Sequence, residues 1–176
     1  MSARLAPSQA LAQVGADLPT VAAPIAAYVP AGYGSGVGGD APVLVRTSGQ
    51  LPMRDGQLVA TGKLGAGVSV EEGYACARQC ALGALAAAAD LVGGIDRLRA
   101  AVRVTAFVAS APDFTQQAQV ANGASELLGE VFAAPGKDQY GRDYPSAHTR
   151  SAVGVAVLPL DAPVEIEVEF LADVDS

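Results

Sequence analysis

The pattern of apolar and polar residues predicts β-strands in five stretches of the chain. The stretches are 42–53, 57–64, 99–110, 150–157 and 164–170. Asp55-Gly56, between the first two, is typical of a tight hairpin turn. A short turn separates the last two stretches, and we expect them to pair as a second hairpin.

The alternation is clearest in 164–170, where the two faces of the predicted strand differ in chemistry. The apolar face consists of Val164, Ile166, Val168 and Phe170, and the polar face of Glu165, Glu167 and Glu169. A slip of one residue would exchange these faces, so the register of this strand is strongly specified. In 150–157 both faces are apolar or small, which predicts a cover on both sides of the sheet.

Two helices are predicted between the strands. Ser69-Val70-Glu71-Glu72 is a capping box, from which a helix with an apolar stripe runs to about Val92 and ends at Gly93-Gly94. Pro112-Asp113 opens a second helix over roughly 113–133.

The resulting order, β-β-α-β-α-β-β, predicts an α+β fold with one mixed sheet and two helices on one face. A neighbouring copy is the simplest cover for the other face, so we expect a closed homo-oligomer. Residues 28–176 form a single domain, preceded by a loosely ordered arm at 1–27 that is rich in Ala and Pro. The Gly-rich stretch 26–42 and the polar stretch 133–149 are predicted loops, and the second is long for a compact domain.

The composition is that of a folded protein and disfavours nucleic acid as a partner. Apolar residues make up 51% of the chain, and the net charge is -7 with eleven scattered basic residues. Such a chain has no basic stripe to neutralise a phosphate backbone. We find neither a secretory signal nor the run of about 20 apolar residues that a membrane span requires, so we expect a cytoplasmic protein without a membrane partner.

Cys76 and Cys80 are the only cysteines and lie four residues apart in the first predicted helix. Their side chains share a helix face without pointing at each other, which suits a disulfide badly. Because His148 is the only histidine, a Cys/His zinc site is not indicated either. We interpret both cysteines as small buried residues and expect no metal.

Arg150 heads the strand 150–157 and has two possible roles. It pairs with a glutamate across the predicted hairpin, or its planar guanidinium binds the carboxylate of a ligand bidentately. The residue pattern leaves both roles open, and it singles out none of the three glutamates in 164–170. His148 lies two residues before Arg150 and could serve as a second acid or base.

Four blocks of the sequence resemble, in the same order, the signature of the Rid/YjgF reactive-intermediate deaminase family. They are TSGQLP (47–52), VANGASELLGEVF (120–132), RSAVGVAVLP (150–159) and VEIE (164–167). In that family an arginine heads a strand that ends in Leu-Pro, and an E-I-E strand follows at this spacing. The resemblance covers residues 42–171, about three-quarters of the chain.

The resemblance implies a chorismate-mutase-like fold, a homotrimer with ligand clefts between subunits, and hydrolysis of imines and enamines without a cofactor. A substrate such as 2-aminoacrylate would yield the 2-keto acid and ammonia. Arg150 would hold the substrate carboxylate and Glu165 would orient the attacking water. The pocket would be lined by Tyr28, Ser48, Gly49, Asn122 and the backbone of Ala152, which stands where many members have Cys.

Three alternatives stay open. A non-catalytic binder or regulator of small carboxylates would keep Arg150 without needing Glu165. The segment 133–149 adjoins Arg150 and would, as a lid, admit a larger substrate such as an aminomuconate-type enamine. The ribonuclease activity claimed for some relatives conflicts with the acidic charge of this chain.

Overall fold

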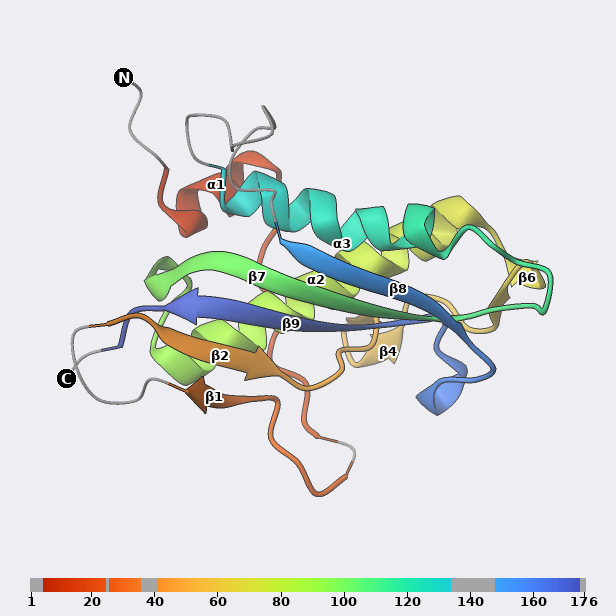
Figure 1. Cartoon of the computed structure of the whole chain (residues 1–176), viewed down its shortest axis with the longest axis horizontal. Coiled ribbons are helices and arrows are strands. Elements are labelled where there is room, and N and C mark those ends of the chain that lie inside the picture. Colours follow the sequence, from red (N-terminus) through yellow and green to blue (C-terminus); the bar gives the residue numbers. More distant parts are fainter. Residues whose placement is uncertain (1–4, 25, 36–40, 134–147, 175–176) are drawn as a thin grey trace.

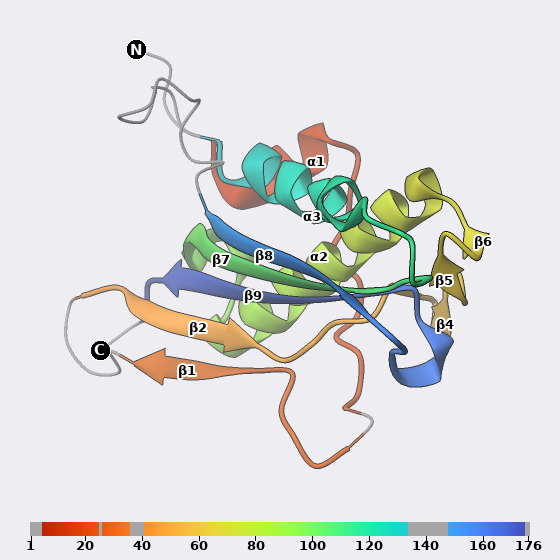
Figure 2. The same ribbon diagram turned by 45° about the vertical axis from the view of Figure 1, so that its right-hand side comes forward.

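The computed structural model describes residues 5–24, 26–35, 41–133 and 148–174. The predicted loop 133–149 therefore lies, apart from its ends, outside the described residues. Figures 1 and 2 show a sheet with helices packed along one of its faces. This arrangement confirms the expected α+β fold.

The main sheet contains five strands in the order β1, β2, β9, β7 and β8. Their bounds are Ala31–Ser35 for β1, Val43–Thr47 for β2, Leu98–Ala109 for β7, Thr149–Val155 for β8 and Val164–Ala172 for β9. The pairing of β7 with β8 is parallel and the other pairings are antiparallel, so the sheet is mixed as expected. Two short ribbons accompany it, β3 (Met53–Arg54) with β4 (Gln57–Leu58), and β5 (Lys63–Leu64) with β6 (Gly67–Val68).

The first two strands of the sheet differ from the prediction. The stretch 57–64 contributes only β4 and β5, while β1 forms within 26–42, the Gly-rich stretch expected to be a loop. Asp55 and Gly56 both have positive φ (51° and 78°), so the predicted turn exists, but it joins β3 to β4. Glycine lowers strand propensity, and pairing with β2 overrides this preference in β1.

The expectation of a hairpin between 150–157 and 164–170 was wrong. β8 and β9 do not pair with each other, because β7 lies between them and pairs with both. The connection passes through the short helix η2 (Pro159–Asp161). Alternation shows which side chains share a face but not which strand is the neighbour, so the same pattern fits either arrangement.

Helices α2 (Val70–Val92) and α3 (Gln117–Val131) lie side by side on one face of the sheet (Figure 2). The capping box of α2 is present, since Ser69 Oγ accepts from the Glu72 amide and the Glu72 carboxylate accepts from the Ser69 amide. Gly93, with φ of 82°, ends the helix in the left-handed conformation. The predicted bounds of α2 are confirmed, and α3 is shorter than the predicted 113–133.

The N-terminal arm also differs from the expectation of loose order. Within it, α1 (Pro7–Gln13) packs beside α3, and Leu11 is only 5% exposed. A second short helix, η1 (Ile95–Arg97), holds α1 in place, because the Ser8 amide and hydroxyl both donate to the Asp96 carboxylate at 2.8 Å. Apolar burial against α3 orders a segment whose own sequence has weak periodicity.

The core lies between the helices and one face of the sheet. The predicted faces of β9 are confirmed: residues 164, 166, 168 and 170 are buried, and residues 165, 167 and 169 lie on the other face. In β7, Val104, Ala106 and Val108 are buried as expected, but Val102 is 36% exposed. The register shifts between Ala101 and Arg103, and this bulge turns Val102 away from the core.

By length and composition alone, α2 could cross a membrane. However, 67% of its most apolar window is buried inside the fold. Cys76 and Cys80 belong to this buried part and are both free, and burial raises the pKa of the Cys76 thiol to about 11. We interpret α2 as the central helix of the core.

Helix α3 lies close to the backbone of α2 at Gly123. A Cβ at this position would overlap with the backbone carbonyl of Tyr74 in α2. Hydrogen bonds from Tyr74 Oη to Glu126 (2.7 Å) and from Arg78 to Glu130 (2.8 Å) join the helices on the outer side. Gly123 therefore sets the distance between α2 and α3.

We expect Gly123→Ala to lower the free energy of unfolding by about 3 kcal/mol, because backbone cannot move aside as a flexible side chain does. Urea denaturation measures the change. Gly32→Ala is the matched control, since a Cβ there would meet its nearest neighbour at 3.9 Å. Equal destabilisation by both substitutions would contradict the role of Gly123.

Candidate functional site

Arg150 lies at the start of the edge strand β8 and points toward α3. In register it is beside Val104 of β7, on the face that the helices cover. Its Nη1 donates to Asn122 Oδ1 and to Ser125 Oγ, both at 2.9 Å, and its Nη2 donates to the carbonyl of Ala118 at 3.2 Å. Three neutral acceptors from one helix thus hold the guanidinium.

The hydrogen bonds of Arg150 leave it able to bind an anion. Two of its five N–H groups have no acceptor among the described residues, which is the number that a bidentate carboxylate takes. Within the described part of the chain it also forms no ion pair. The expected alternative, pairing with a glutamate across a hairpin, does not occur because the glutamates of β9 face the other side of the sheet.

Ser125 links Arg150 to His148. The Ser125 hydroxyl accepts from Arg150 and lies 2.9 Å from His148 Nε2. Burial, and next the positive charge of Arg150, lower the pKa of His148, which favours a neutral imidazole at pH 7. A neutral His148 that accepts from Ser125 completes the hydrogen bonding of this hydroxyl.

The residues around Arg150 form one group, which we call the arginine group: Asn122, Ser125, His148, Arg150 and Ala152. Ala152 follows two residues after Arg150 on the same face of β8 and packs against the core. Ser125 was not singled out from the sequence. It lies three residues after Asn122, and this spacing places both side chains on one face of α3, which could have pointed to it.

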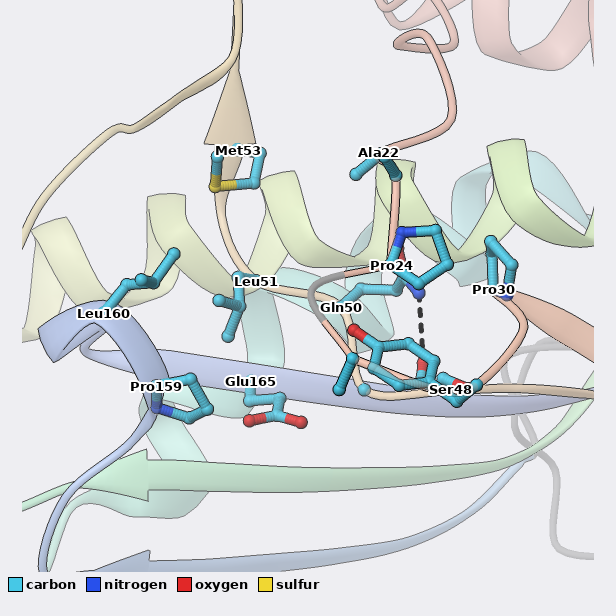
Figure 3. Close-up of a pocket in the computed structure, with 14 residues that line it drawn as sticks. Ala22, Pro24, Pro30, Ser48, Gln50, Leu51, Met53, Pro159, Leu160 and Glu165 are labelled. Carbon is cyan, nitrogen blue, oxygen red and sulfur yellow. Dashed lines mark hydrogen bonds between the residues drawn. The ribbon is translucent and has the colours of Figure 1, made fainter.

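Glu165 lies on the opposite face of the sheet, in register with Phe107 of β7. It borders a cavity of about 400 Å³, which we call the glutamate cavity (Figure 3). The polar lining comes from Tyr28, Ser48, Gln50 and Glu165, together with the backbone at Gly49. Apolar side chains complete the wall, among them Ala22, Pro24, Leu51, Met53 and Leu160.

The segment after β2 brings the backbone of residues 48–50 against β9. Gln50 and Ile166 exchange two backbone hydrogen bonds of 2.8 and 3.0 Å, and Ser48 Oγ donates to the carbonyl of Val29 at 2.6 Å. A Cβ at Gly49 would overlap with the Glu165 carboxylate. Glycine at this position therefore makes the space that the carboxylate occupies.

The predicted site residues thus fall into two groups. The structure brings Tyr28, Ser48, Gly49 and Glu165 together, and it brings Asn122, Arg150 and Ala152 together. Because the sheet separates Arg150 from Glu165, one chain does not present both side chains to one small ligand. The Met53 and Leu160 walls of the glutamate cavity, and its wall from 22–24, were not anticipated.

Residues 8–161 match the family model described as "YjgF/chorismate_mutase-like, putative endoribonuclease". The chain belongs to the YjgF (Rid) family. The four blocks that suggested this family lie at the end of β2, in α3, in β8 and in β9. These segments build the arginine group and part of the glutamate cavity.

Similarity to individual proteins extends over nearly the whole chain. Protein TCP17 of Trypanosoma cruzi is 41% identical over 157 residues, which are 89% of this chain and 88% of TCP17. Protein Atu1372 of Agrobacterium tumefaciens is 35% identical, with a TM-score of 0.75, over 96% of this chain and 94% of Atu1372. A Shewanella oneidensis protein is 28% identical, with a TM-score of 0.78, over 95% of this chain and 99% of that protein.

The environment of Glu165 makes its charged form unfavourable. Burial, and next the negative charge of Glu167, raise the pKa of Glu165 above that of an ordinary glutamate. The folded chain therefore binds this proton more tightly than the unfolded chain does. Stability falls as the pH rises from the unfolded pKa through the folded pKa.

We expect Glu165→Gln to be more stable than the wild type at pH 7, because the glutamine is neutral at every pH. The difference should shrink at about pH 3.5, where the wild-type carboxyl is protonated in both states. Denaturation at the two pH values measures it. Glu167→Gln is the control and should change the stability at pH 7 less than Glu165→Gln does. A Glu165→Gln variant that is less stable than the wild type at pH 7 would contradict the prediction.

Proposed function

We propose that this protein is an imine and enamine hydrolase that acts at clefts between copies of the chain and yields a 2-keto acid and ammonia. The observation that carries the proposal is the guanidinium of Arg150, held by three neutral acceptors and paired with no carboxylate of the described residues. The half-buried Glu165 carboxylate supplies the second catalytic group. The family membership supports the same chemistry.

Arg150 binds the carboxylate of the substrate. A 2-imino acid has one carboxylate next to its reactive carbon, so bidentate binding to the guanidinium fixes the orientation of the C=N bond. Asn122 and Ser125 hold the guanidinium in place before the ligand arrives. The Ser125 hydroxyl also lies within hydrogen-bond distance of His148 Nε2, and the lowered pKa of His148 favours its neutral form.

Glu165 acts as the general base. An enamine first takes a proton at C3 and loses one from nitrogen, which gives the imine. Glu165 then accepts a proton from water as the water oxygen bonds to C2, and the π electrons pass to nitrogen. Glu165 returns this proton to nitrogen, which gives a carbinolamine. The hydroxyl proton of the carbinolamine then passes to nitrogen as the C–N bond breaks, so that ammonia leaves and the C2–O bond becomes the carbonyl of the keto acid. A positioned base of this kind typically contributes about 10²–10⁴-fold to the rate, and the raised pKa of Glu165 makes it a stronger base.

A second copy of the chain completes the site. The sheet separates Arg150 from Glu165 within one chain, so the substrate lies between the arginine group of one copy and the glutamate cavity of another. The exposed face of the sheet, where Val153 is 45% exposed, supplies the surface for this contact. A closed ring of three copies fits such a head-to-tail contact.

The family description and the name of the Shewanella protein both mention an endoribonuclease. The net charge of -7 and the scattered basic residues of this chain disfavour a polyanionic substrate. The hydrolase with a small substrate is therefore the function that we propose.

Arg150→Ala should lower kcat/KM by about 10²-fold or more, because two charge-assisted hydrogen bonds worth about 1.5–3 kcal/mol each are lost. The assay measures keto-acid formation from enzymatically generated 2-aminoacrylate above the spontaneous rate. Arg150→Lys keeps the charge without the bidentate geometry, so its kcat/KM should lie between those of the wild type and Arg150→Ala. Arg99→Ala, which removes an exposed arginine paired with Asp173, is the control.

Two results would separate this proposal from its alternatives. Wild-type activity in Arg150→Ala would exclude Arg150 as the carboxylate-binding residue. If the wild-type protein binds pyruvate through Arg150 but hydrolyses no imine, it is a non-catalytic carboxylate binder.

Co-expression of Arg150→Ala and Glu165→Gln chains tests the shared site. Each variant alone should be inactive, because every cleft lacks one of the two groups. In a random equal mixture, about a quarter of the clefts combine an intact arginine group with an intact glutamate cavity, so about a quarter of wild-type activity should return. No recovery in a mixed oligomer would place both groups of a site within one chain.

A further inference from the structure

A second cavity lies between the N-terminal arm, the β3–β4 ribbon and α2. Its volume is about 1020 Å³, and we call it the arm cavity. It is lined by residues 14–23 of the arm, by residues 53–56 of the ribbon and by Ala75, Arg78, Gln79 and Leu82 of α2. We propose that the arm cavity binds a short peptide of two or three residues with free termini. This site goes beyond the proposed function, because neither Arg150 nor Glu165 lines it.

The backbone of the arm is open to pairing along the cavity. Residues 17–24 form no helix, no strand and no backbone hydrogen bond to another described residue. The chain is held on both sides of this segment, since α1 packs beside α3 and β1 pairs with β2. An extended peptide beside such a segment gains main-chain hydrogen bonds, and its side chains enter the adjoining space. The arm therefore offers the peptide a partner strand.

Arg54, in the β3–β4 ribbon, is placed to bind the carboxylate of the peptide. Its Nη2 donates to Gln79 Oε1 at 3.2 Å, and Gln79 Nε2 donates to the carbonyl of Met53 at 2.8 Å. Gln79 belongs to α2 and is only 6% exposed, so a buried amide holds the guanidinium at the cavity. Four of the five N–H groups of Arg54 have no acceptor among the described residues, and a bidentate carboxylate needs two.

The charged side chains that line the arm cavity carry both signs. They are Asp17, Arg54, Asp55 and Arg78, and only Arg78 forms an ion pair with a described residue, Glu130 at 2.8 Å. Asp17 comes from the arm and Arg54 from the ribbon, so two opposite charges belong to different walls. A peptide with free termini matches them, because its ammonium group pairs with Asp17 and its carboxylate with Arg54. A phosphate group would be repelled by Asp17 and Asp55.

The volume and the apolar lining indicate the size of the ligand. The volume of about 1020 Å³ lies at the upper end of the range for pockets that hold drug-sized ligands, about 300–1,000 Å³. A single amino acid would leave most of this volume to water. Val14, Leu18, Val21 and Leu82 line the cavity and are partly buried against the core. They offer apolar surface to the side chains of a di- or tripeptide.

The arm cavity adjoins the glutamate cavity without sharing its polar side chains. Ala22, Ala23 and Met53 line both, and Figure 3 shows Ala22 and Met53 from the side of the glutamate cavity. Tyr28, Ser48, Gln50 and Glu165 line the glutamate cavity alone. The peptide therefore occupies a site of its own.

Calorimetry with L-leucyl-L-leucine tests the site. The N-acetyl derivative lacks the ammonium group, and the C-terminal amide lacks the carboxylate. The wild type should bind the free dipeptide about tenfold more tightly than the amide, because the bidentate pair with Arg54 is lost. It should bind the free dipeptide about threefold more tightly than the acetyl derivative, because Asp17 is exposed and its ion pair is weaker.

Arg54→Gln should weaken binding of the free dipeptide about tenfold and leave the affinity for the amide unchanged, because the amide has no carboxylate to lose. Asp17→Asn should weaken it about threefold and leave the affinity for the acetyl derivative unchanged. Arg54→Lys keeps the charge and a donor for Gln79, so its affinity should lie between those of the wild type and Arg54→Gln. The matched controls are Arg99→Gln and Asp113→Asn, at exposed positions outside the cavity, and both should bind like the wild type.

Hydrogen exchange measured by mass spectrometry gives an independent readout. The amides of residues 17–23 should exchange about tenfold more slowly when the dipeptide is bound, because the peptide then pairs with the backbone of the arm. β8 lies outside the arm cavity and serves as the internal control, with unchanged exchange.

Each outcome bears on the arm cavity whether or not the protein hydrolyses an imine. Failure of the wild type to bind the dipeptide, or unchanged exchange in the arm on binding, would overturn the proposal. Equal affinity for the free dipeptide and a dipeptide blocked at both ends would indicate an internal segment of a longer chain and would overturn it too. Binding that Arg150→Ala abolishes and Arg54→Gln leaves intact would place the dipeptide at the arginine group instead.

Discussion

The pairing of β7 with a strand on each side is the constraint on which the rest of the structure depends. β7 pairs in parallel with β8 and antiparallel with β9. Because β7 and β8 are parallel, the chain must return along the sheet between them, and α3 makes this crossover connection over one face. The crossover places Arg150 beneath α3, and the antiparallel partner places Glu165 on the other face. The positions of the two charges therefore follow from strand pairing and not from any attraction between them.

Small residues allow the helices to hold Arg150 closely. The buried face of α2 is mostly alanine, and Gly123 lets α3 approach the backbone of α2. This close packing explains how a chain with 5% aromatic residues builds a dense core. It also fixes the face of α3 that carries Asn122 and Ser125, so the guanidinium meets acceptors on a rigid element.

Burial in the glutamate cavity changes the chemistry of Glu165. The cavity joins segments far apart in the sequence: the wall after α1, the end of β2, the connection at η2 and β9. Its apolar wall removes water from Glu165, which raises the pKa of that carboxyl group. The proposed base strength of Glu165 therefore follows from its burial.

The sequence by itself determined the features that depend on local periodicity and capping. The bounds of α2, the buried and polar faces of β9 and the turn at Asp55-Gly56 could be read from it, because neighbouring residues decide them. The family signature also indicated Arg150 and Glu165. Only the tertiary structure decided that β8 pairs with β7, that β1 forms in a Gly-rich stretch, and that α1 is ordered. Only the tertiary structure shows that Arg150 and Glu165 lie on opposite faces of the sheet, because pairing and burial between distant segments leave no local pattern in the chain.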